Sequence, residues 1–194
     1  MEDATYFEPF EYSLNTNISS RYEHNLFGIF DFFGLAENQF YFLTTPSFAP
    51  ENLLVLERKY DGYTLTHTVL SKHYWRVFYD NDRITSVGKN IATSKLEKQI
   101  GDKLFHLLDK TIMEAKQPRG GGFVLDGINY KLSKMIAGKQ KIVSKHSPKG
   151  DSKSGKIIAV MGLLVENINN LDNALLRSIE AKVNEILGRF ARDF

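Results

Sequence analysis

Cysteine is absent from this sequence of 194 residues. Its absence excludes a disulfide framework, a catalytic thiolate and any metal centre that cysteine would ligate. Long apolar runs are also missing, because the longest one, 157–165, falls well short of the roughly 20 residues that a membrane-spanning helix needs. The first residues, Met1 to Tyr6, are acidic and lack the basic and apolar regions of a signal peptide. We therefore expect a soluble protein that resides in the cytoplasm.

Recognisable catalytic and metal-binding motifs are missing too. No two histidines have the spacing of a helical metal site, and the sequence has no Gly-x-Ser-x-Gly motif. The glycine run at 120–122 lacks the Gly-Lys-Ser/Thr ending of a phosphate-binding loop and is typical of a linker. A small enzyme with its site around His67, His73 and Tyr74 is kept as a third hypothesis. Our leading interpretation is a protein that is not an enzyme and that uses no metal or cofactor.

Length and composition favour one folded domain that spans residues 1–194. Hydrophobic residues make up 42% of the chain and charged residues 25%, which are ordinary values for a globular protein. A domain of this size buries roughly 70% of its unfolded surface, so its core needs neither disulfides nor a metal.

Residue alternation predicts a meander of strands in the first half of the chain. Asp61-Gly62 separates the segments 53–59 and 63–70, and Asp-Gly is a favoured hairpin turn because both central positions need a positive φ. A further strand is expected at 74–79.

Aromatic residues are concentrated near the amino terminus. The aromatic runs 26–33 and 39–43 are predicted as buried strands, with a helical turn as the alternative. A second group either belongs to the core or anchors an interface, where aromatic residues are enriched. That group consists of Tyr6, Phe7, Phe10 and Tyr12.

Helices are expected around a second block of strands. Ser94 and Glu97 match a capping box, which predicts a helix with an apolar stripe that runs to Ala115. Asp126-Gly127 predicts a second hairpin within 123–132, and 139–146 is expected to be a strand.

The carboxyl-terminal part is expected to be helical after an exposed loop at 147–155. The apolar segment 157–165 predicts a buried helix, and Asn170 or Asp172 can cap the next one. One face of that last helix is lined by Leu176, Ile179, Val183, Ile186 and Phe190. Strands in blocks and helices in blocks indicate an α+β fold, with an antiparallel sheet of hairpins and a meander and with helices packed on one face.

Charge is distributed unevenly along the chain. The net formal charge is +2, but eight lysines and a single acidic residue lie between Lys131 and Lys156, with no arginine among them. The eight are Lys131, Lys134, Lys139, Lys141, Lys145, Lys149, Lys153 and Lys156. A solvated basic face, an acidic protein partner and nucleic acid are the three interpretations, and the lack of arginine disfavours base-specific readout. If the partner is an acidic protein, we expect the contacts to be made by Lys139, Lys141, Lys145 and Lys149.

One stretch of the sequence resembles a family. It consists of Phe123 to Leu132, followed by Gly138-Lys139, by His146-Ser147-Pro148 and by a leucine-rich final helix. The stretch is similar to a Phe-x-x-Asp-Gly-x-x-Tyr…Ser-Pro arrangement in small bacterial proteins, some of which look like immunity proteins against secreted polymorphic toxins. His146 departs from that arrangement, which has an aromatic residue there. The resemblance implies a protein-binding function and carries over no catalytic residue.

These observations lead to two functional hypotheses. The first is a non-catalytic protein-binding module, an immunity protein that binds and neutralises a bacterial toxin. The alternative is a nucleic-acid-associated protein that uses the basic segment from Lys131 to Lys156. Neither hypothesis involves a membrane.

Overall fold

One antiparallel sheet organises the protein. The computed structural model describes residues 6–12, 17–81, 87–117 and 126–190, and within these ranges seven strands pair in the order β1-β7-β6-β2-β3-β4-β5. The strands are β1 (Glu8–Pro9), β2 (Gln39–Pro46), β3 (Asn52–Arg58), β4 (Tyr63–Leu70), β5 (Lys89–Leu96), β6 (Ile128–Ile136) and β7 (Lys139–His146). The β2–β5 meander therefore accounts for one half of the sheet, and the β6–β7 hairpin extends it on the other side of β2.

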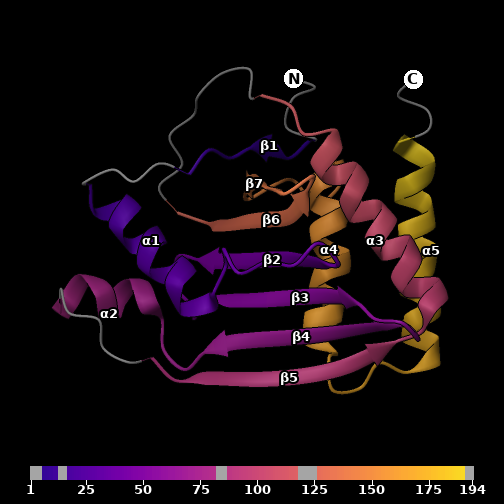
Figure 1. Ribbon diagram of the computed structural model, residues 1–194, viewed down its shortest axis with the longest axis horizontal. Coiled ribbons are helices and arrows are strands. Elements are labelled where there is room, and N and C mark those ends of the chain that lie inside the picture. Colours follow the sequence, from indigo (N-terminus) through magenta and orange to yellow (C-terminus); the bar gives the residue numbers. More distant parts are fainter. Residues whose placement is uncertain (1–5, 13–16, 82–86, 118–125, 191–194) are drawn as a thin grey trace.

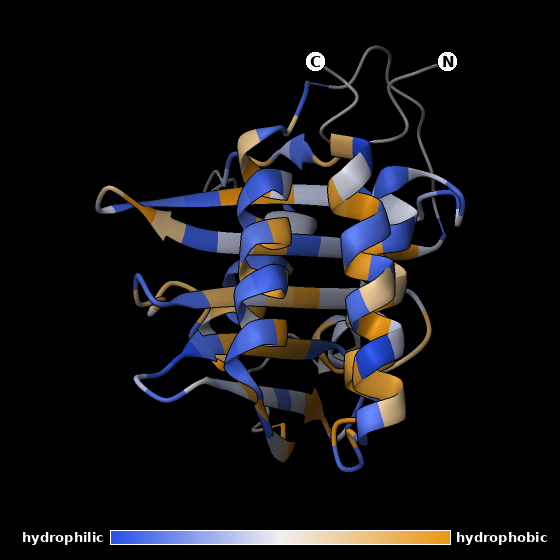
Figure 2. Cartoon of the chain, turned by 90° about the vertical axis from the view of Figure 1, so that its right-hand side faces the viewer, coloured by the Kyte–Doolittle hydropathy of each residue, from blue (hydrophilic) through white to orange (hydrophobic). Residues whose placement is uncertain are grey.

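Helices cover both faces of the sheet, whereas the sequence predicted helices on one face only, and the two groups of helices lie toward different ends of the strands. The helices are α1 (Ile18–Phe30), α2 (Tyr74–Asn81), α3 (Lys98–Met113), α4 (Lys153–Glu166) and α5 (Asn173–Phe190). Figure 1 shows α1 and α2 together at one end of the strands, with α3 and α5 at the other. Figure 2 looks onto the side of α3 and α5, where hydrophobic and hydrophilic residues alternate along each helix, as expected for helices with one buried face.

Strand register separates two apolar cores. Val143 pairs with Leu132, Leu132 with Phe42, and Phe42 with Leu54, so these four side chains form a row on the face that α3, α4 and α5 cover. Side chains one position along, such as Leu43, point to the opposite face because the side-chain period of a strand is two residues. There they meet the aromatic residues of α1 and α2.

Several sequence predictions are confirmed. The α+β class with its antiparallel sheet is correct, and so is the hairpin across Asp61-Gly62. The apolar stripe of α3 and the face of α5 from Leu176 to Phe190 are buried as expected. Asp172 caps α5, because its side chain accepts a hydrogen bond from the Leu175 amide at 2.8 Å. No helix of the described residues is both long and apolar enough to cross a bilayer.

Two segments expected to be strands are helices instead. Residues 18–30 form α1, so the helical alternative holds for most of 26–33, and 74–79 lies within α2. In both cases aromatic residues recur on one side of a short helix and pack together. Aromatic content favours strands in general, but here it serves helix packing against the sheet.

Three local predictions differ from the structure: a capping box, a hairpin and an exposed loop. Ser94 lies in β5 and the cap residue of α3 is Glu97, whose side chain makes no capping bond, so the predicted capping box is wrong. The hairpin predicted at Asp126-Gly127 is wrong, because β2 and β7 occupy both edges of β6. Within the segment expected to be an exposed loop, Ser152 to Gly155 are buried, and the Ser152 hydroxyl caps α4. The glycine run at 120–122 lies outside the described residues.

Gly101 allows α3 to approach the sheet, which gives a testable prediction. A Cβ atom at this position would lie 2.0 Å from Cδ2 of the Tyr63 ring. We expect Gly101→Ala to lower the free energy of unfolding by about 2 kcal/mol, although alanine is the better helix former. In α4, Gly162 has open space around the same atom, so Gly162→Ala is expected to raise stability by up to about 1 kcal/mol. Urea denaturation of both variants tests the pair, and equal effects would contradict it.

Candidate functional site

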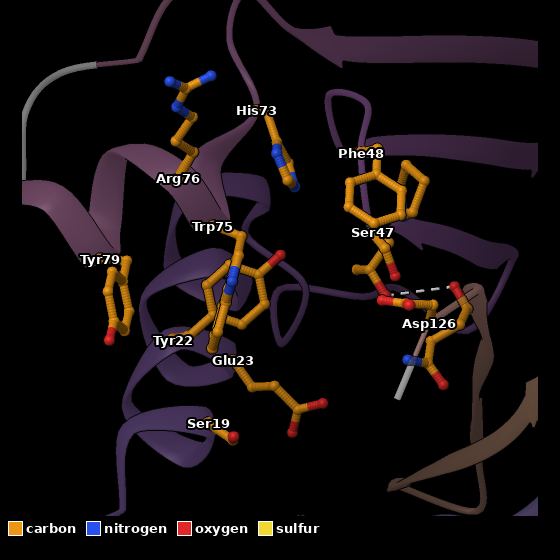
Figure 3. Close-up of a pocket in the computed structure, with 13 residues that line it drawn as sticks. Ser19, Tyr22, Glu23, Ser47, Phe48, His73, Trp75, Arg76, Tyr79 and Asp126 are labelled. Carbon is orange, nitrogen blue, oxygen red and sulfur yellow. Dashed lines mark hydrogen bonds between the residues drawn. The ribbon is translucent and has the colours of Figure 1, made fainter. Parts of the chain in front are cut away.

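A cleft of about 650 Å³ opens where α1 and α2 meet the sheet. One wall is made by residues of these two helices, and the other by the segment that follows β2 together with the start of β6. The first wall includes Tyr22, Glu23, His73, Trp75 and Tyr79, and the second includes Ser47, Phe48 and Asp126. Figure 3 shows these side chains around the opening.

Glu51 fixes the first wall from beneath. Its side chain is fully buried and accepts three hydrogen bonds, from the Tyr22 hydroxyl at 2.6 Å and from the amides of Tyr74 at 2.7 Å and Trp75 at 3.0 Å. The two amides belong to the first turn of α2, whose N–H groups have no partner within the helix. A carboxylate there also has a favourable interaction with the helix dipole. Glu51 therefore joins α1 to α2.

The Tyr22 ring lies at the centre of an aromatic cluster. It contacts the Trp75 ring edge-on, with centroids 4.7 Å apart, and it stacks on Tyr74 at 5.7 Å. Burial first, and the charge of Glu51 second, raise the pKa of the Tyr22 hydroxyl, which keeps the hydroxyl protonated as a donor to Glu51. This packing leaves Trp75 little freedom to move within the wall.

The rim of the cleft exposes two aromatic side chains. Phe48, on the segment between β2 and β3, is 83% exposed, and Tyr79, near the end of α2, is 66% exposed. Figure 3 places them on opposite sides of the opening. A phenylalanine in this state leaves most of its apolar surface in water, at a cost that burial against a partner would remove.

Hydrogen bonds hold the second wall in position. Ser47 Oγ donates to the Gly127 carbonyl at 2.8 Å and accepts from the Gly127 amide at 3.0 Å. The Ser47 amide donates to the same carbonyl at 2.9 Å. Gly127 has a φ of 142°, and a Cβ there would collide with Ser147 Oγ at 2.1 Å. The Asp-Gly pair that the sequence suggested as a hairpin turn instead positions Asp126 beside the cleft.

Charged groups of both signs line the cleft. Glu23 pairs with the buried Lys131, with 2.7 Å between Lys131 Nζ and Glu23 Oε1. Asp126 is exposed and makes no ion pair with the described residues. His73 Nε2 is buried without a hydrogen-bond partner and lies 3.9 Å from Glu51 Oε1. Arg76 extends away from Glu23 (Figure 3).

The four lysines predicted as partner contacts do not lie together. Lys139 and Lys141 are exposed at the β6–β7 hairpin, and Lys149 is exposed beyond the opposite end of β7. Lys145 is 7% exposed and its Nζ lies 2.8 Å from Glu8 Oε1. The structure thus gives Lys145 a role in joining β7 to β1, and it leaves Lys139 and Lys141 at one end of β7 and Lys149 beyond the other end.

The residues of the enzyme hypothesis do not form one site. His67 lies on the sheet face beneath α3 to α5, where burial lowers its pKa, and it is within 3.2 Å of Asn52 Oδ1. His73 and Tyr74 lie at the other face, with α1 and α2. The described residues contain no group of three or more histidine and acidic side chains placed to hold a metal ion.

No family model, curated protein or solved structure matches this chain. Sequence reasoning missed this site because its residues come from four separate segments and because Trp75 and Tyr79 were assigned to a strand. The available signal was the density of aromatic residues before Phe48.

Proposed function

We propose that this protein is a non-catalytic protein-binding module of the cytoplasm, an immunity protein that binds and neutralises a bacterial toxin through the cleft between α1, α2 and the β2–β3 segment. The observation that carries the proposal is the pair of exposed aromatic side chains, Phe48 and Tyr79, on the rim of this cleft. The sequence resemblance to immunity proteins supplies the kind of partner.

The shape and rigidity of the cleft support binding to a protein. Binding energy at protein interfaces is concentrated in a few aromatic and arginine side chains that surround or fill pockets. Here the Trp75 ring is held by Tyr22, and Tyr22 is held by Glu51, so the surface is ordered before the partner arrives. Order before binding lowers the entropic cost of association.

Exposed lysines would add long-range electrostatic attraction to the binding of the partner. Of the eight lysines between 131 and 156, Lys139, Lys141 and Lys149 are the exposed ones, and they would steer a partner with an acidic region. Steering of this kind raises the association rate and weakens as salt is added. Lys145 would contribute indirectly, through the pairing of β7 with β1.

The nucleic-acid alternative receives less support from the structure. Five of the eight lysines between 131 and 156 have Nζ within 4.0 Å of a carboxylate oxygen. Such pairing reduces the positive charge available to phosphates. A nucleic-acid titration at increasing salt checks this alternative, and tight binding that falls steeply with salt would favour it.

The proposed function is tested by shortening the two aromatic side chains on the rim of the cleft and measuring how well the protein still captures its partner. Phe48→Ala and Tyr79→Ala are each expected to weaken partner binding by about 10- to 30-fold. An aromatic residue that becomes buried at the centre of a protein interface contributes about 2 kcal/mol to the binding free energy. The experiment is affinity capture from the native host with the wild-type chain and each variant, followed by titration of the captured protein. A captured toxin that is co-expressed with this protein should lose its effect on growth.

Tyr60→Ala is the matched control for these variants. Tyr60 is fully exposed in the β3–β4 turn, which lies at the opposite end of the strands from α2 (Figure 1). The control is expected to capture the same protein as the wild type. If both rim variants also capture it with unchanged affinity, the cleft is not the binding surface.

A further inference from the structure

We propose that the cleft accepts a cationic side chain of the partner, an arginine guanidinium or a lysine ammonium, between Trp75 and the carboxylates of Glu23 and Asp126. This inference deepens the proposed function, since it names the chemistry of the group that the cleft binds. It stands on three features of the cleft, which are its aromatic wall, the carboxylates that line it and a buried negative charge beneath it.

The aromatic wall provides the first part of a cation site. Trp75 lines the cleft with Tyr22 and Tyr79, and the Trp75 and Tyr79 rings lie 6.3 Å apart with 32° between their planes. The face of an indole ring is the strongest aromatic partner for a cation, and desolvation in a cleft strengthens the attraction. The aliphatic stem of lysine or arginine gains apolar contact from the same rings.

Two carboxylates provide the second part. Figure 3 shows Glu23 extending from α1 into the space between Trp75 and the wall that carries Asp126. Lys131 pairs with Glu23 from within the protein, whereas Asp126 makes no ion pair with the described residues. Within the part of the chain that the structure describes, Asp126 is therefore a counter-ion that a cation entering the cleft could pair with.

The buried Glu51 provides the third part. Among the described residues, no lysine or arginine pairs with this fully buried carboxylate, and the nearest basic group is His73 at 3.9 Å. Its hydrogen-bond donors, including Tyr22, stabilise the negative charge without cancelling it. Tyr22 and His73 line the cleft directly above it, so the field of this charge reaches the cleft through a medium of low polarity.

Trp75 allows a direct test, because it is the single tryptophan of the chain. Its indole N–H gives one NMR resonance that reports on the cleft. We expect this resonance to shift in a saturable manner when blocked arginine or blocked lysine is added, with dissociation constants on the order of 1 mM. Blocked citrulline has the shape of arginine without its charge, and it should bind at least about tenfold more weakly.

Asp126→Asn should weaken the binding of blocked arginine about threefold and leave that of citrulline unchanged. Asp61→Asn is the matched control, since it makes the same change of charge in the exposed β3–β4 turn, and it should bind as the wild type does. Equal binding of arginine and citrulline, or no saturable shift with arginine or lysine, would overturn the inference. Equal affinity of Asp126→Asn and Asp61→Asn for arginine would also overturn it.

The outcomes separate this inference from the proposed function. If rim truncation abolishes partner capture while arginine and citrulline bind alike, the protein-binding function stands and the cation site is rejected. If arginine binds selectively while the Phe48 and Tyr79 variants keep full affinity for the partner, the cleft is a cation site, but both its role as the partner surface and the assignment of the cation to the partner are rejected.

Discussion

Replacement of Glu51 by alanine is expected to lower the free energy of unfolding by about 4 kcal/mol, one of the largest effects of a single substitution in this protein. The side chain is fully buried and accepts hydrogen bonds from the Tyr22 hydroxyl and from the amides of Tyr74 and Trp75. Truncation leaves all three donors without this acceptor inside the protein, and each unsatisfied buried donor costs about 1–3 kcal/mol. Urea denaturation followed by circular dichroism measures the loss.

Two further variants sharpen the test of Glu51. Glu51→Gln keeps an acceptor oxygen but points an amide NH₂ group at one of the three donors, so we expect a loss of about half the size. Glu37→Ala removes an exposed glutamate and should leave stability unchanged. If Glu51→Ala is as stable as Glu37→Ala, Glu51 does not hold the helices, and the rigidity ascribed to the cleft has no basis.

The Glu51 bonds also explain why α2 was missed in the sequence. Glu51 binds the first turn of α2 from 23 and 24 positions away in the chain. Residues 74–79 cover less than two helical turns and have no capping motif of their own, so their few aromatic residues fitted a strand as well as a helix. The acceptor that stabilises the start of this helix becomes visible only when the chain is folded.

Local signals were sufficient where they repeat over many residues. The apolar stripe of α3 and the buried face of α5 each span four or more turns, and the turn at Asp61-Gly62 requires backbone conformations that glycine favours. The strand β5 gave no such signal. Most of its side chains are exposed, including Ile91, because it pairs only with β4 and lies at the edge of the sheet.

The candidate site was harder to predict than the fold because the residues that interact there are far apart in the sequence. The lysine-rich segment was visible in the sequence, but the acids that neutralise parts of it were not. Glu23 is 108 positions from Lys131, and Glu8 is 137 positions from Lys145. Composition therefore overestimated the exposed positive charge, and it gave no indication that the cleft would gather residues from four segments.

The ion pair of Lys131 and Glu23 gives the second large expected effect on the free energy of unfolding. We expect replacement of Glu23 to cost more stability than replacement of Lys131. Lys131 is 4% exposed, with its Nζ 4.7 Å from the centre of the Phe10 ring, whereas the Glu23 side chain is 28% exposed. Glu23→Gln leaves a buried ammonium without its counter-charge, and we expect a loss of about 3 kcal/mol. Lys131→Met replaces the cation by an apolar chain of similar length, while Glu23 can turn to water, so the expected loss is below about 1 kcal/mol.

The double variant Glu23→Gln/Lys131→Met distinguishes this account from a surface ion pair. Because the methionine removes the charge that Glu23 compensates, the double variant should be almost as stable as Lys131→Met alone. A thermodynamic cycle from four urea titrations measures the coupling. Equal losses for the two single variants, with a coupling near zero, would mean that Lys131 is solvated, and they would return it to the exposed charges that a partner can reach.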